Sequence, residues 1–133
     1  MPLVIQADAL KVAADYLAAA VPTVTDPAGF TFGGTDIQPT VTPVNKVMCR
    51  YIGGISEGPT HARPRIDVLV WADGTVSTQG KALKMARTLH GMMRRDLRTR
   101  DFASPVLLPD PANASKKLAL FTIELLTKGV QSP

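Results

Sequence analysis

The residue types that build metal and redox sites are scarce in this chain of 133 residues. It holds one cysteine, Cys49, and two histidines, His61 and His90. One thiol excludes an internal disulfide framework, and this set cannot form a zinc cluster of the usual spacing. Cys49 lies beside Met48 among apolar residues, and we expect it to be a small strand residue, because free cysteine is mostly buried. The sequence predicts no metal and no cofactor.

A catalytic constellation is also missing. Nucleophilic catalysis needs a nucleophile within hydrogen-bonding reach of a base. Asp67 and Asp73 are too isolated to be assigned a paired acid–base role, and Ser77 shares no recognisable motif with a histidine. We interpret His61 as a loop residue and His90 as a partly buried helix residue. The sequence therefore predicts that the protein is not an enzyme.

Long hydrophobic runs are absent. None approaches the roughly 20 apolar residues of a membrane-spanning helix, and the N-terminal residues, which include Asp8, lack the basic region of a secretory signal. Hydrophobic residues make up 45% of the chain and charged residues 20%, which is a globular composition. We expect one soluble domain over residues 1–133, without a membrane partner and large enough to bury its own core.

What the sequence does have is a concentration of positive charge. The formal net charge is +4, and all of the excess lies between residues 81 and 100, since the rest of the chain is slightly acidic. The cations there are Lys81, Lys84, Arg87, Arg94, Arg95, Arg98 and Arg100, against Asp96 alone. Such a field suits nucleic acid, an acidic protein surface or plain solvent, and these alternatives stay open at this point.

Apolar spacing predicts two helices. The first begins between Pro2 and Ala7 and runs to Val21, where Pro22 ends it. The second is capped by Ser77 or Thr78 and runs to about residue 97. Its apolar stripe consists of Ala82, Met85, Ala86, Leu89, Met92 and Met93. We assign this stripe to the core, because methionine fills irregular gaps between packed elements.

Alternating residues predict strands at 47–52, 65–72 and 118–127, the first two joined as a hairpin. The strand at 65–72 is apolar on both faces, so it lies centrally in a sheet or at a subunit contact. Turn residues dominate 101–117, where Val106–Leu108 is either a short edge strand between prolines or a partner-docking loop. Residues 22–46 are rich in proline and glycine, and we interpret them as an arm or hairpin that projects from the core.

The predicted fold class is therefore α+β: a single-domain sandwich with a mostly antiparallel or mixed sheet of about four strands, two helices on one face, and the projecting arm. Two helices cannot cover all the apolar surface of such strands, which favours oligomerisation.

This element order, with a strand of the sequence RPRIDVLVWA, a short turn and an Ala-, Leu- and Met-rich helix ending in basic residues, resembles the tail terminator proteins of long-tailed bacteriophages, also called tail completion or minor tail proteins. The resemblance implies a virion protein, assembled in the host cytoplasm, whose hexameric ring caps the tail tube at its head-proximal end. The ring would stop tube polymerisation and offer a surface to the head–tail connector. Its partners would be copies of itself, the tail tube protein and connector proteins, with DNA only passing through the lumen.

Charge and apolar character, rather than family motifs, select the candidate site residues. For docking to the tube or the connector we select Arg94, Arg95, Arg98, Arg100, Val106, Leu107 and Leu108. For the subunit interface we select Phe30, Phe32, Ile37, Val41, Leu69 and Trp71. Two other functions remain: a head–tail connector or stopper protein of the neck, and a nucleic-acid-binding regulator that uses the basic helix 77–100. The latter lacks a helix-turn-helix partner of standard spacing and aromatic residues interleaved for base stacking.

Overall fold

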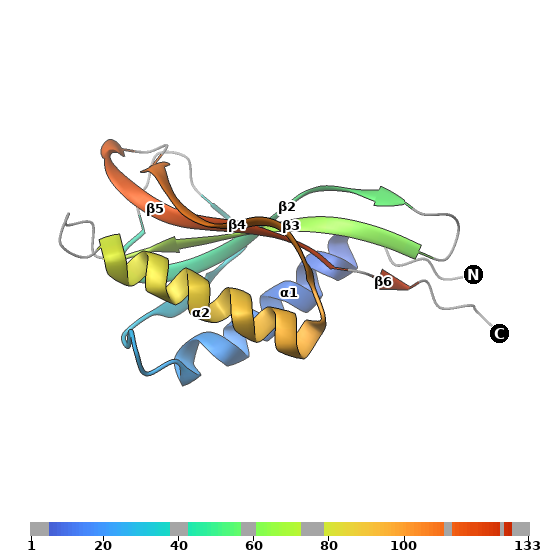
Figure 1. Cartoon of the computed structure of the whole chain (residues 1–133), viewed down its shortest axis with the longest axis horizontal. Helices are drawn as coiled ribbons and strands as arrows, with labels where there is room; N and C mark the ends of the chain where they lie inside the picture. Colours follow the sequence, from blue (N-terminus) through green and yellow to red (C-terminus); the bar gives the residue numbers. More distant parts are fainter. Residues whose placement is uncertain are drawn as a thin grey trace.

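A mixed β-sheet with two helices packed against it forms the fold (Figure 1). The computed structural model describes residues 6–37, 43–56, 61–72, 79–110, 113–125 and 127–128. The elements, in chain order, are α1 (Gln6–Ala20), the 3-10 turn η1 (Val21–Thr23), β1 (Thr31–Gly34), β2 (Lys46–Ser56), β3 (His61–Trp71), α2 (Gln79–Leu97), β4 (Arg100–Asp110), β5 (Asn113–Glu124) and β6 (Thr127–Lys128). The predicted α+β class is confirmed.

Five strands lie in the order β1-β2-β3-β5-β4, and the two-residue β6 pairs with the start of β3. The pair β1–β2 is parallel and the other pairs are antiparallel. The predicted hairpin of β2 and β3 is confirmed, with Cys49 opposite Val68. β3 is a central strand, while β1 and β4 form the two edges.

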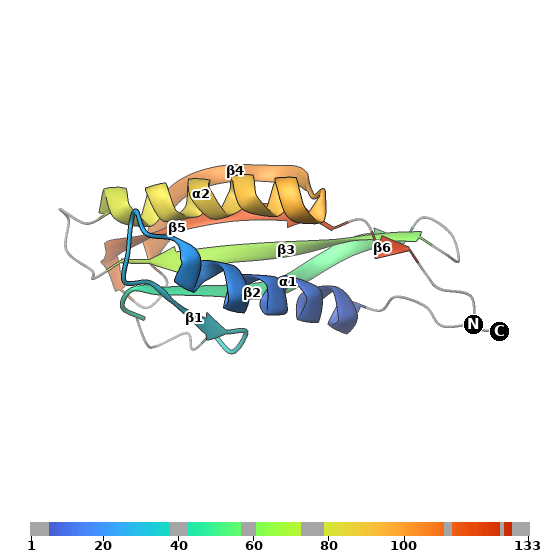
Figure 2. The ribbon, with the colours of Figure 1, turned by 90° about the horizontal axis from the view of Figure 1, so that it is seen from below.

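Both helices lie on the same side of the sheet, side by side (Figure 2). The main core fills the space between them and the sheet. Leu17 of α1 and Leu89 of α2 are fully buried there, against Val68 and Phe121 of the central strands. Met92, which the sequence assigns to the stripe of α2, is only partly buried, whereas Met85 and Met93 are fully buried. No helix in the described ranges is long and apolar enough to cross a membrane.

The sequence predicts a projecting arm over residues 22–46, and this is wrong for residues 22–37. Phe30 is 6% exposed and belongs to the main core. β1 then joins the sheet as a parallel edge strand, with Thr31 opposite Lys46. Burial of Phe30 and the hydrogen bonds of β1 anchor this segment to the domain. The rest of the predicted arm includes residues 38–42, which lie outside the described residues.

The prediction of turns over residues 101–117 is also wrong. β4 is a continuous strand of eleven residues, and it forms the edge of the sheet. The predicted edge strand at Val106–Leu108 is thus confirmed but is part of a longer element. Pro105 and Pro109 are compatible with this position, because an edge strand has a partner on one side only. Register shifts between Asp101 and Val106 interrupt its ladder.

Candidate docking surface

The sheet face opposite the helices carries a small apolar cluster of its own. Its buried members are Met48, Leu69, Trp71 and Leu118, with Ile37 and Leu120 packed against them. The indole Nε1 of Trp71 donates a hydrogen bond to Oδ2 of Asp110 at 3.1 Å. Leu69 and Trp71 are each 3% exposed. A single chain already covers these two predicted interface residues, so neither offers surface to a neighbour.

The other predicted interface residues are similarly committed. Phe30 lies in the main core, Phe32 is partly buried against it, and Ile37 packs on the cluster around Trp71. Val41 lies outside the described residues. The segment from Phe30 to Ile37 therefore stabilises its own domain. An interface between copies needs other side chains.

Ion pairs occupy the middle of the helix-free face. Asp67, whose side chain is 6% exposed, accepts hydrogen bonds from Thr122 Oγ1 at 2.6 Å and from Arg50 Nε at 3.0 Å. Arg65 Nε contacts Glu124 Oε2 at 3.2 Å. Both carboxylates are largely buried, whereas the Arg50 side chain is 46% exposed. Asp67 and Glu124 are thus each paired with an arginine that is more exposed than the carboxylate.

Exposed apolar side chains follow one side of the edge strand β4. Phe102, Val106 and Leu108 are 51%, 47% and 39% exposed. Val106 and Leu108 pair with Leu120 and Leu118 of β5, whose side chains belong to the helix-free face. Leu107, between them, packs against the main core instead, because successive strand residues alternate between faces. Of the predicted triplet, Val106 and Leu108 remain available for docking.

Phe102 is a residue that sequence reasoning missed. Its ring is exposed, and the guanidinium carbon of Arg65 lies 4.0 Å from the ring centroid, which is a cation–π geometry. Spacing in the sequence could not identify it, because register shifts on both sides of Ala103 break the alternation of β4 between its faces. The prolines at 105 and 109 also favoured an interpretation as turns.

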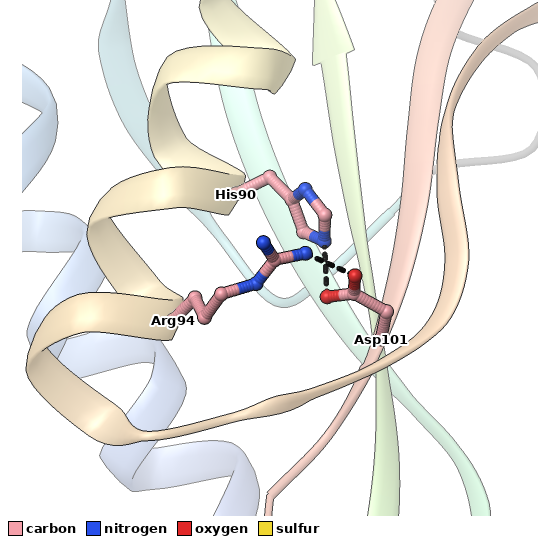
Figure 3. Close-up of polar contacts among 3 residues, drawn as sticks. All are labelled: His90, Arg94 and Asp101. Atoms are coloured by element: carbon pink, nitrogen blue, oxygen red, sulfur yellow. Dashed lines mark hydrogen bonds and ion pairs between the residues drawn. The ribbon is translucent and has the colours of Figure 1, made fainter.

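The end of α2 and the start of β4 form a corner in which Asp101 joins two helix side chains (Figure 3). His90 Nε2 lies 2.7 Å from Asp101 Oδ1, and Arg94 forms an ion pair with Asp101 Oδ2. The His90 side chain is 11% exposed, and its ring packs against Phe121 with centroids 5.1 Å apart. Arg94, predicted as a docking residue, is therefore engaged within its own chain.

Arg95 is engaged in the same way. Its Nε and Nη2 atoms donate to the two carboxylate oxygens of Asp96, at 2.7 and 3.0 Å. Asp96 also accepts a hydrogen bond from Tyr16 of α1. The Arg95 bonds, followed by that of Tyr16, lower the pKa of Asp96 to about 2. Burial, with the bond to Asp96, raises the pKa of Tyr16 to about 12. These contacts tie the C-terminal end of α2 to α1.

Arg98 and Arg100 differ from the preceding arginines. Both are exposed, and neither has an ionic partner among the described residues. Arg98 follows the last residue of α2 with a φ of 53°, a left-handed conformation in which glycine is preferred. Between them, Thr99 is 6% exposed and its hydroxyl has no partner within the described ranges. The chain thus reverses from helix to edge strand with two cations on the outside.

The described residues include no group of three metal-ligating side chains. Burial raises the pKa of the Cys49 thiol to about 12, so this cysteine is a poor nucleophile at neutral pH. Among the described residues, the surface features suited to docking are the exposed apolar side chains of β4 and the basic corner at Arg98 and Arg100.

No family model matches this chain, and no curated protein sequence matches it.

Proposed function

We propose that this protein is a tail terminator of a long-tailed bacteriophage, a structural subunit whose sixfold ring caps the tail tube. The ring ends tube polymerisation and carries the surface to which the head–tail connector docks. Support comes from the sequence resemblance together with the confirmed α+β class of the subunit. The proposal makes the chain an assembly module without enzymatic activity.

The observation that carries the proposal is the open edge of the sheet at β4. An edge strand presents unpaired N–H and C=O groups, and proteins usually protect long edges with charges, bulges or covering elements. β4 has eleven residues, and its prolines and register shifts limit backbone pairing with a neighbour, whereas the side chains of Phe102, Val106 and Leu108 remain exposed. Burying the exposed half of each side chain would contribute about 1 kcal/mol. A surface of this kind suits contact with another subunit.

Ring closure requires two different faces of each subunit to meet. β4 is one sheet edge and β1 is the other. We assign the middle of the β4 edge, at Val106 and Leu108, to one half of the contact between neighbouring copies. The basic corner beyond it, at Arg98 and Arg100, remains for the tube or the connector.

Native mass spectrometry over a concentration series tests self-association. A discrete hexamer without larger open-ended species is the expected result. Val106→Lys should shift the population to monomers, because it places a charge in the apolar edge. Val12→Lys is the matched control: Val12 is 44% exposed, close to the 47% of Val106, but lies on α1. Equal loss of assembly in both variants would contradict the assignment of β4.

The capping role needs a test in assembled particles. Tails formed without this chain should lose their uniform length and remain without heads. Normal headed particles in its absence, together with a monomer at every concentration, would refute the proposal. A head–tail connector or stopper would instead leave tail length unchanged while heads lose their DNA or fail to join.

A nucleic-acid-binding regulator is the alternative of another class, favoured by the cations of α2. Against it, the apolar stripe of α2 packs on the sheet, and α1, its neighbour, precedes it by three strands in the chain. This arrangement is not a helix-turn-helix. Salt-sensitive binding to duplex DNA in a gel shift would favour the regulator, and no binding at low salt would exclude it.

A further inference from the structure

We infer that the corner between α2 and β4 is a docking site for a carboxylate-rich segment of a partner protein, bound by Arg98 and Arg100 beside Phe102. The inference rests on the proposed function, because it specifies the chemistry of the surface that the tube or the connector contributes.

Positive charge is in excess at the corner between α2 and β4. Residues 94–101 contain four arginines and two aspartates. Asp101 is paired with Arg94 and His90, and Asp96 is paired with Arg95 and bonded to Tyr16. Both local carboxylates are therefore satisfied. The charges of Arg98 and Arg100 are left facing solvent, where they attract an anionic partner.

The backbone at Arg98 has a left-handed conformation. A side chain in the left-handed region is unfavourable by about 1 kcal/mol relative to glycine at such a helix end. The chain nevertheless has arginine at φ 53°, fully outside the core. An outlier of this kind at an exposed cation points to a functional side chain.

An exposed apolar side chain, Phe102, lies close to these cations in the chain. Arg100 and Phe102 are two residues apart on β4, and Arg100 is opposite Glu124, on the helix-free face. Arginine and aromatic residues together are the side chains most enriched at energetically important positions of protein interfaces. A partner with carboxylates for the arginines and an apolar residue for Phe102 fits this corner.

The same residues disfavour nucleic acid. Single-stranded nucleic acids bind through several aromatic rings that stack on bases. Among the described phenylalanine, tyrosine and tryptophan residues, Phe102 is the exposed one on β4. The Arg65 guanidinium already covers one face of its ring. Arginine binds carboxylate and phosphate alike through two parallel hydrogen bonds, so the preference for a protein partner rests on Phe102, whose second ring face suits an apolar side chain.

The test is the affinity of the full chain for a fluorescent peptide of glutamate and leucine, measured by anisotropy at low salt, with single-stranded DNA of matched charge as the competing probe. Arg98→Gly and Arg100→Gln should each weaken peptide binding about threefold, as expected for exposed charge contacts. Arg98→Gly should not lower the thermal unfolding midpoint, because glycine suits the left-handed backbone better. This variant therefore separates docking from folding.

Arg87→Gln is the matched control, because Arg87 is an exposed cation within α2, the helix that Arg98 follows. It should leave peptide affinity nearly unchanged. Three results overturn the inference: no peptide binding, equal weakening by Arg87→Gln, or tighter binding of DNA than of the peptide. If the protein forms the discrete ring but fails these tests, the proposed function stands and the docking site at the corner is refuted. If it stays monomeric but binds the peptide as expected, the ring is refuted and the docking site stands.

Discussion

Removal of the Asp101 carboxylate is the most direct probe of how the basic end of α2 is held. Asp101→Ala leaves His90 without its partner in a site where the His90 side chain is 11% exposed. A hydrogen bond to a charged group contributes about 2 kcal/mol when its partner is largely buried. The pair of Asp101 with Arg94 is more exposed, at 37% and 55%, and such pairs contribute about 0.5 kcal/mol.

The variant should therefore be destabilised by about 2.5 kcal/mol, most of it through His90. For a domain of this size the loss corresponds to a fall of about 10 °C in the thermal unfolding midpoint. Circular dichroism on heating and urea denaturation provide the two measurements.

Double-mutant cycles separate the two partners of Asp101. His90→Phe retains a ring against Phe121 while removing the imidazole nitrogens, and Arg94→Met removes the guanidinium. The coupling of Asp101 with His90 should exceed its coupling with Arg94 by about 1 kcal/mol. Equal couplings, or a larger one for Arg94, would refute the reasoning that burial decides which contact stabilises the corner.

Three further predictions concern the core and the titration of single groups. Leu89→Ala should destabilise the fold by about 3 kcal/mol, because Leu89 is fully buried and its loss leaves a cavity; a change below about 1 kcal/mol in urea denaturation would contradict the assigned core. Cys49 should resist alkylation at pH 8 and react once the protein is denatured, since its thiol pKa is about 12. The carboxyl of Asp96 should titrate near pH 2 in an NMR experiment. Because the folded pKa lies below the ordinary aspartate value of 3.8, the stabilisation from Asp96 is present above pH 4 and is lost as the pH falls through about 2; a midpoint near 3.8 would show that its bonds do not persist in solution.

Sequence periodicity identified the helices and the central strands well. The stripe from Ala82 to Met93 and the alternation of Ile66, Val68 and Val70 reflect local repeats of 3.6 and 2 residues, which determine the buried face before any tertiary contact is known. The same reasoning identified Val106–Leu108 as part of an edge strand. It failed for the rest of β4, because prolines that elsewhere mark turns are tolerated on the open side of a sheet.

The candidate site was only partly predictable for a related reason. The four arginines near the end of α2 look equivalent in the sequence. Their contacts differ in the structure. The chain reverses at Arg98, which brings Asp101 next to Arg94 and His90. In addition, Tyr16 of α1 donates a hydrogen bond to Asp96, the partner of Arg95. Neither contact follows from spacing along one helix.

The sequence by itself determined which residues form helices, which strand residues are apolar on both faces, and that cations accumulate near residue 100. These properties depend on neighbours a few positions apart. Only the tertiary structure decided that Phe30 joins the core rather than an arm, that β4 is a complete edge with Phe102 exposed, and that Arg98 and Arg100 remain without a partner among the described residues. Those outcomes depend on strand pairing and ion pairs between distant segments, which form only when the whole chain has folded.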